Sequence, residues 1–178
     1  MIGIIGLHRG LLTVRSLSRL LLPKLLLLCL VTAFGVQAEE LWGRVVRVSD
    51  GDSITVIDAG RKEFRVRLAG IDAPERGQPY NRVARTSLSH LLAGAIVVVQ
   101  VDKVDRFGRL VGRVQVGGMD ASLEQLRAGM AWFYRRYEDD LPPALRSAYA
   151  AAEGEARASR SGLWRDAEPV PPWVWRRR

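Results

Sequence analysis

Acidic residues in two turn-like segments are the first candidates for chemistry in this sequence. Asp50 and Asp52 flank Gly51, and Asp72 and Glu75 lie on either side of an Ala-Pro pair. If the strands that carry these turns end close together, Asp52 and Asp72 can share a hard divalent cation, because oxygen ligands alone favour calcium or magnesium. Each segment also has a structural interpretation, as a hairpin turn and as a capped loop, so the acids alone do not define a site.

Two arginines add to these acids. Arg67 precedes Asp72 by five residues, and Arg109 closes a turn that begins at Asp105. A guanidinium stays charged at any relevant pH and suits bidentate contacts with phosphate oxygens. A cation, two arginines and a free carboxylate would together suit a phosphodiester, with Glu75 taking a proton from the attacking water. The alternative is that both arginines are surface charges paired with acidic residues, which applies to most of the 21 arginines after residue 38.

The composition excludes several other kinds of site. The chain has 178 residues with one cysteine, Cys29, and two histidines, His8 and His90. If the first 38 residues are removed, one histidine and no cysteine remain, which excludes thiol nucleophiles, disulfide frameworks and cysteine-rich zinc sites. The formal net charge of +8 suits a polyanionic partner without requiring one.

The first 38 residues have the layout of a secretory signal. Residues 1–24 carry positive charge and no acidic residue, residues 25–36 are an apolar run, and small or apolar residues precede the end of the segment at Ala38. We expect cleavage after Ala38 and a secreted or periplasmic protein. The alternative is an uncleaved anchor, although 12 apolar residues are fewer than the roughly 20 that span a bilayer. A membrane contact is expected only through this leader.

Residues 41–116 show the pattern of β-strands. Short runs rich in β-branched residues alternate with turn-forming residues. The predicted strands cover residues 44–48, 53–57, 64–68, 96–101 and 110–116, and a helix at residues 80–92 is inserted before the fourth strand. Five short strands with a helix in this place fit an OB-type β-barrel.

The remainder of the chain is helical and then rich in proline, tryptophan and arginine. Asp120 is a suitable N-cap for a short helix, and a longer helix is predicted over about residues 142–160. The tail begins at about residue 166, and residues 169–178 are predicted to be an extended segment whose tryptophans pack on the body of the protein. Its three terminal arginines, residues 176–178, are predicted to be a solvated end. We therefore predict an α+β fold over residues 39–178, a five-stranded OB-type barrel with three helices.

Several short motifs follow one another between about residues 41 and 175. They are Asp50-Gly51-Asp52-Ser53, the nine residues Arg67–Glu75, Gln78-Pro79-Tyr80, Asp105-Arg106-Phe107-Gly108-Arg109, Gly129-Met130-Ala131-Trp132 and Ser161-Gly162-Leu163-Trp164. In this order and spacing the chain resembles the thermonuclease, or staphylococcal-nuclease-like, family. The family's fold is an OB barrel with three helices, which agrees with the prediction made from the residues.

The resemblance implies a calcium-dependent nuclease. The implied site residues are the carboxylates of Asp52 and Asp72 and the main-chain carbonyl of Ala73 for the metal, Asp50 behind them, and Arg67, Glu75 and Arg109 for catalysis. In this assignment Glu75 activates the water, while the two arginines hold the scissile phosphate and stabilise the transition state. Such enzymes cut single-stranded DNA and RNA, and duplex DNA less readily, to products with a 3′-phosphate.

Aromatic residues are the implied partners of the nucleobases. The resemblance favours Tyr137 for base contact, with Phe107 next, and Tyr80 is a further candidate that also has a packing interpretation at the start of a helix. Two departures from the best-known member occur, because Ala73 stands in place of a threonine and Phe107 in place of a tyrosine. The second departure removes one hydroxyl donor near the phosphate.

A non-catalytic module on the same fold is the alternative to an enzyme. OB folds commonly bind single strands without cutting them, and barrels of this family also serve as interaction domains. The complete set of acids and arginines favours the enzyme, since a binding-only module has no need of a metal pair and a base. DNA and RNA are the expected partners, no obligate protein partner is implied, and a monomer is expected.

Overall fold

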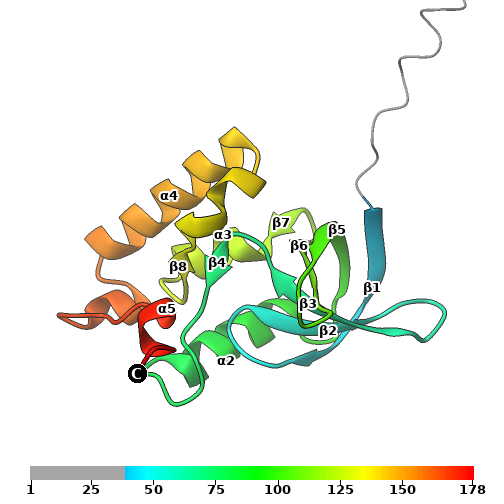
Figure 1. The fold of residues 1–178 in the computed structure, drawn as a ribbon, viewed down its shortest axis with the longest axis horizontal. Coiled ribbons are helices and arrows are strands. Elements are labelled where there is room, and N and C mark those ends of the chain that lie inside the picture. Colours follow the sequence, from blue (N-terminus) through cyan, green and yellow to red (C-terminus); the bar gives the residue numbers. More distant parts are fainter. Residues whose placement is uncertain (1–38) are drawn as a thin grey trace, which may run out of the picture. The chain divides into compact units, whose positions relative to one another are not determined.

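The computed structural model describes residues 39–178 (Figure 1). The predicted leader and its cleavage after Ala38 lie outside the described residues and stay predictions. Within residues 39–178, no helix combines the length and the apolar character needed to cross a membrane.

Five strands close into a barrel. They are β1 (Glu39–Val48), β2 (Ser53–Ile57), β3 (Glu63–Leu68), β5 (Ile96–Val104) and β6 (Leu110–Val116). Neighbours pair antiparallel in the order β3-β2-β1-β5-β6, and a parallel pairing of β3 with β6 closes the sheet on itself. The predicted OB-type barrel is confirmed. β1 and β5 are longer than predicted because their outer ends are polar or exposed and lack the apolar alternation that the prediction relied on.

Valines on alternate positions fill the barrel. Val56 of β2, Val66 of β3, Val99 of β5 and Val114 of β6 are completely buried. Successive side chains of a strand point to opposite faces, and branched side chains pack well on a pleated sheet. The barrel is therefore a packed core, and the candidate site residues lie in its turns and in the elements around it.

The three predicted helices are present as α2 (Asn81–Leu92), α3 (Ala121–Arg127) and α4 (Pro143–Ala158). Asp120 caps α3 as predicted, because its side chain accepts a hydrogen bond from the amide of Leu123 at 3.0 Å. The shorter elements are β7 (Met119–Asp120) and the helical turns η2 (Arg135–Asp140), η3 (Gly162–Arg165) and α5 (Pro172–Trp175). The prediction of an extended tail is wrong at α5, where proline occupies the first helical position that tolerates it.

A second, two-stranded sheet positions the acidic loop, the segment of residues 72–75 that carries Asp72 and Glu75. β4 (Ile71–Asp72) pairs antiparallel with β8 (Trp132–Phe133). The chain enters β4 through Gly70, whose φ is 75° and whose carbonyl accepts a hydrogen bond from the amide of Tyr134 at 2.8 Å. Strands of two residues are too short to show a periodic pattern, so the sequence did not predict them. This sheet connects Asp72 to the helical part of the chain.

The acidic turn between β1 and β2 is packed too closely to be a free hairpin turn. A Cβ on Gly51 would lie 2.7 Å from the Cβ of Ala73 and 2.8 Å from the Cβ of Ala84 in α2. The buried amide group of Gln125 in α3 donates hydrogen bonds to the carbonyls of Gly51, at 2.8 Å, and of Ala84, at 3.1 Å. The turn is thereby fixed against both the acidic loop and two helices.

Replacing Gly51 by alanine tests this packing. We expect Gly51→Ala to lower the free energy of unfolding by about 1–3 kcal/mol, because the added methyl group has to displace its neighbours. The control is Gly154→Ala in the exposed part of α4, where a Cβ meets nothing within 4 Å and helix propensity predicts a gain of up to about 1 kcal/mol. Urea-induced unfolding measures both changes, and a Gly51→Ala protein as stable as the parent would contradict the close approach.

Candidate active site

Arg67 brings Asp52 and Asp72 into one site. The register of β2 and β3 pairs Ser53 with Arg67, which places the guanidinium beside the residue that precedes β2. The Nη1 atom of Arg67 lies 3.2 Å from Oδ2 of Asp52, and its Nη2 atom lies 2.7 Å from Oδ1 of Asp72. Two carboxylates far apart in the sequence thus lie close enough to contact the same guanidinium.

Both carboxylates are buried, and both accept contacts from neighbouring donors. Asp52 is 3% exposed and Asp72 is 0% exposed, and Asp52 also accepts hydrogen bonds from Oγ of Ser53 at 2.8 Å and from the amide of Ala73 at 3.0 Å. Burial by itself would lower the pKa of Arg67, but the two aspartates more than offset this effect and raise the pKa above its ordinary value. Buried charges are tolerated when they are paired and hydrogen-bonded, and these contacts meet that condition.

Asp50 supports the turn that carries Asp52. Its Oδ1 atom accepts a hydrogen bond from the amide of Asp52 at 3.0 Å. Burial, followed by the negative charge of Asp52, raises the pKa of Asp50 to about 7. A carboxyl shifted in this way marks a crowded and partly desolvated group of acids, where a bound cation would have a large electrostatic effect.

Glu75 lies in the loop that follows β4 and depends on Gln78 for its position. The amide of Glu75 donates a hydrogen bond to Oε1 of Gln78 at 2.9 Å, and Nε2 of Gln78 donates to the carbonyl of Val170 at 2.6 Å. Gln78 is buried, although the sequence pattern assigned no role to it. The candidate base is thereby connected to a distant segment near the C-terminus.

The C-terminal tail places a further arginine on the same acids. Nη2 of Arg176 lies 2.7 Å from Oδ2 of Asp72 and Nη1 lies 3.2 Å from Oδ1, while Nη1 also pairs with the carboxylate of Glu75. The prediction of a solvated arginine end is therefore wrong for Arg176. No local signal distinguishes it from Arg177 and Arg178, so only the path of the tail in three dimensions reveals its role.

Asp105 holds Arg109 at the turn between β5 and β6. The Asp105 carboxylate accepts hydrogen bonds from Nε of Arg109 at 2.8 Å and from the amides of Arg109 and Phe107, and Arg65 donates to the Phe107 carbonyl at 2.7 Å. Burial alone would raise the pKa of Asp105, but the hydrogen bonds from Arg109 and Phe107 lower it. The turn is thus a fixed frame for Arg109, and Arg65 is a supporting residue that the sequence did not indicate.

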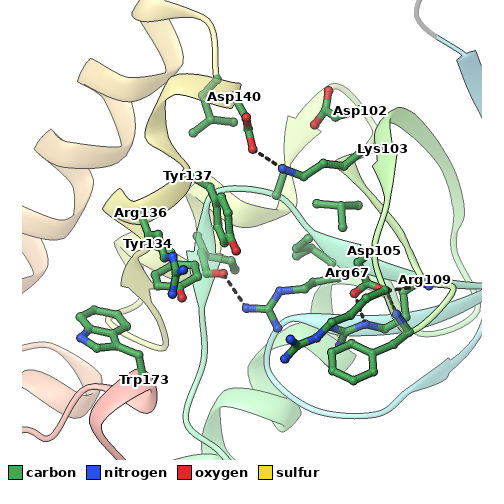
Figure 2. Close-up of a pocket in the computed structure, with 18 of the residues that line it drawn as sticks. Arg67, Asp102, Lys103, Asp105, Arg109, Tyr134, Arg136, Tyr137, Asp140 and Trp173 are labelled. Carbon is green, nitrogen blue, oxygen red and sulfur yellow. Dashed lines mark hydrogen bonds and ion pairs between the residues drawn. The ribbon is translucent and has the colours of Figure 1, made fainter. Parts of the chain in front are cut away.

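A cleft of about 1000 Å³ joins these residues to aromatic side chains (Figure 2). Its basic and aromatic lining residues include Arg67, Arg109, Arg176, Phe107, Tyr134, Tyr137 and Trp173. Figure 2 shows the first two arginines on the barrel side of the cleft, with Tyr134, Tyr137 and Trp173 facing them from the segment after β8 and from the tail. Positive charge combined with aromatic rings is typical of surfaces that bind single-stranded nucleic acid.

Two of the three predicted base-binding aromatics lie in this cleft. Phe107 and Tyr137 line it and are 57% and 46% exposed, whereas Tyr80 is not among its lining residues. Tyr80 packs against a second buried cluster that is rich in tryptophan, so its packing interpretation agrees with the structure. Tyr134 and Trp173, whose rings stack with centroids 5.4 Å apart, are cleft residues that the sequence pattern did not assign to the substrate.

The acidic residues of the site offer oxygen ligands that suit a hard metal ion. Residues 39–178 contain no cluster of three or more histidine, cysteine, aspartate or glutamate side chains that could enclose one. Asp52 and Asp72 nevertheless contribute hard oxygen atoms around one cationic position, and the amide of Ala73 contacts Asp52, which brings the main chain of Ala73 to the same place. Two carboxylates and a main-chain group fit calcium or magnesium, which complete their coordination with water, better than they fit a transition metal.

Comparison with known proteins identifies the family. The family model described as "Staphylococcal nuclease homologue" matches residues 65–166, which is more than half of the chain. This chain belongs to the staphylococcal nuclease homologue family. The matched range includes Arg67, Asp72, Glu75 and Arg109.

Relatives of this chain carry names that agree with the family. It is similar to an uncharacterized endonuclease of Escherichia coli, with 43% identity over 153 residues, 85% of this chain and 95% of the relative. A second uncharacterized endonuclease, from Haemophilus influenzae, is 36% identical over 159 residues, 89% of this chain and 85% of the relative. A micrococcal nuclease of Shigella flexneri is 43% identical over 144 residues, 76% of this chain and 80% of the relative. This chain is therefore a nuclease, a hydrolase that acts on nucleic acid.

The support of Arg109 by Asp105 can be tested directly. We expect Asp105→Ala to lower kcat/KM by about tenfold to a hundredfold, because Arg109 loses the carboxylate that orients it. Asp58→Ala is the matched control, since Asp58 closes another turn by accepting a hydrogen bond from the amide of Lys62 at 2.8 Å but does not line the cleft. Initial rates on a nucleic acid substrate measure the effect. Equal losses in both variants would show that Asp105 acts on stability and not on Arg109.

Proposed function

We propose that this protein is a calcium-dependent nuclease that cuts single-stranded DNA and RNA, and duplex DNA less readily, to products with a 3′-phosphate. The observation that carries the proposal is the contact of Arg67 with both Asp52 and Asp72, because it joins two hard carboxylates and a guanidinium suited to phosphate. The two carboxylates and the main-chain carbonyl of Ala73 would hold calcium, which when bound supplies charge stabilisation to the scissile phosphate.

Glu75 is the proposed general base. Its side chain is 37% exposed and lines the cleft, whereas Asp52 and Asp72 are buried beneath the arginines. Of these three acids, Glu75 is therefore the one that a water molecule can reach. Its carboxylate would take a proton as that water attacks phosphorus, and the hydrogen bond from its amide to Gln78 keeps the loop in place.

Arg67 and Arg109 are the proposed phosphate ligands. Arg67 enters the cleft from β3 and Arg109 from the turn that follows β5, and both line it (Figure 2). A guanidinium has five N–H donors, and the pairing acids use only some of them. The remaining donors would bind phosphate oxygens and stabilise the negative charge that grows in the transition state. Phe107 offers a ring and no hydroxyl beside them.

The aromatic side of the cleft supports the preference for single strands. Phe107 and Tyr137 present exposed rings on which unpaired bases can stack. Stacking on an aromatic side chain contributes about 1–3 kcal/mol per base in proteins that bind single strands, and bases within a duplex are not available for it. The substrate contacts would therefore discriminate between strand states more than between DNA and RNA.

We further propose that the protein is exported and acts as a monomer. The basic and then apolar leader that ends at Ala38 supports a secreted or periplasmic location. The monomer is supported by the site itself, because all proposed catalytic and metal-binding side chains come from one chain.

Metal dependence is the first property to measure. The purified protein is expected to hydrolyse single-stranded DNA with calcium and to lose that activity in excess EGTA, because the acids that hold the cation cannot replace its charge at the phosphate. Analysis of the product ends is expected to show 3′-phosphates. Hydrolysis that is unchanged in EGTA, or tight binding without cleavage under every divalent ion tried, would contradict the proposal.

The role of Glu75 predicts a specific kinetic defect. We expect Glu75→Gln to lower kcat by about 10²–10⁴-fold, the range of general-base catalysis, while calcium and nucleotide binding persist. Glu63→Gln, at an exposed position of β3, is the control for loss of one negative charge. Rates under saturating substrate and separate binding titrations distinguish chemistry from binding, and an unchanged kcat would assign the base to another residue.

A further inference from the structure

The C-terminal segment is built into the cleft. Pro172, the first residue of α5, is buried, and the ring of Trp173 stacks on Tyr134 with centroids 5.4 Å apart. Just before them, the carbonyl of Val170 accepts the hydrogen bond from Gln78 at 2.6 Å. These contacts fix the tail to Gln78 and to Tyr134, and the next arginine of the tail, Arg176, reaches the acids. The tail beyond residue 166 lies outside the range that the family model matches.

Arg176 occupies the acids that the proposed reaction needs. Each oxygen of Asp72 accepts a hydrogen bond from Arg176, at 2.7 Å and 3.2 Å, and the carboxylate of Glu75 pairs with the same guanidinium. Oδ1 of Asp72 also contacts Arg67 at 2.7 Å. In this arrangement two arginines balance the buried charge of Asp72.

Such contacts oppose both proposed roles of these acids. A metal ligand has to offer a lone pair to the cation, and a general base has to be free to take a proton from water. Arg176 engages Asp72 and Glu75 at once, and its positive charge would repel a divalent cation at the same position. Calcium and Arg176 would therefore compete for the same carboxylate oxygen atoms.

We propose that Arg176 is an internal competitor of the cation, which caps Asp72 and Glu75 in the calcium-free protein and is displaced when calcium binds. This inference rests on the proposed calcium-dependent function and adds the regulation of that site by the protein's own C-terminus. The nuclease would be switched from a capped to an open state by the concentration of calcium.

The exposure of the cap makes it reversible. The Arg176 side chain is 39% exposed, and ion pairs that water can reach contribute little net stability. Asp72 keeps its contact with Arg67 when Arg176 leaves, so opening does not strand a buried charge. A bound ion that favours the open state shifts the equilibrium by its differential affinity, and the capped fraction lowers the apparent affinity for calcium in proportion.

Direct binding of calcium tests the competition. Isothermal titration calorimetry of the purified full chain without nucleic acid gives the dissociation constant for the parent, for Arg176→Ala and for Arg178→Ala. The last variant is the control, because it removes the same charge from the same tail at a residue that lies over the ring of Trp175 and forms no ion pair within residues 39–178. Thermal unfolding with and without calcium gives a second readout of the same equilibrium.

The expected result is tighter binding in one variant only. Arg176→Ala should bind calcium about tenfold more tightly than the parent, the size expected if most of the calcium-free protein is capped, and its melting temperature should rise more on calcium addition. Arg178→Ala should resemble the parent. Arg176→Gln, which keeps a polar side chain without the charge, repeats the test if the alanine variant is unstable.

Each other outcome overturns the inference. Equal dissociation constants in the parent and Arg176→Ala, weaker binding in Arg176→Ala, or equal tightening in both alanine variants would each show that Arg176 is not a specific competitor. In these cases calcium-dependent cleavage by the parent leaves the proposed function intact. If no variant binds calcium and the parent does not cleave with it, the proposed function and the inference both fail.

Discussion

Two buried carboxylates that contact one guanidinium are the constraint on which the rest of this structure depends. Asp52 and Asp72 are removed from water, and such a pair is stable only with a countercharge at hydrogen-bonding distance. The strand register that sets Ser53 opposite Arg67 supplies that charge. The close packing of Gly51 on α2 and the short β4–β8 sheet then hold the two acidic segments against each other.

The cleft lies between the barrel and the segments that follow β8. The barrel contributes Arg67 and Arg109, each held by acids, while the segment after β8 and the tail contribute aromatic rings. The ion pairs with these acids fix the orientation of both guanidinium groups on the barrel. The aromatic side chains lie on less regular segments, which suits the recognition of strands that vary in sequence.

Buried acids need a countercharge within the protein. Asp72 is completely buried and contacts Arg67 on one side and Arg176 on the other. The second arginine arrives from a tail that is anchored at Trp173 and through Gln78, so balancing the charge also covers Glu75. The same guanidinium therefore both compensates the buried charge of Asp72 and pairs with the carboxylate of Glu75.

Local patterns in the sequence determined the five main strands and the three main helices, because strand and helix periodicity and turn chemistry act over a few residues. They singled out the acids and arginines as candidates for the site. They also indicated Asp105 beside Arg109, since both belong to one turn. Only the tertiary structure decided which distant residues share the site. The pairing of β4 with β8, the support from Gln125 and the arrival of Arg176 at Asp72 all depend on contacts between segments that no local pattern connects. The same reason applies to Tyr80, which does not line the cleft. Its packing against the tryptophan-rich cluster depends on the fold as a whole.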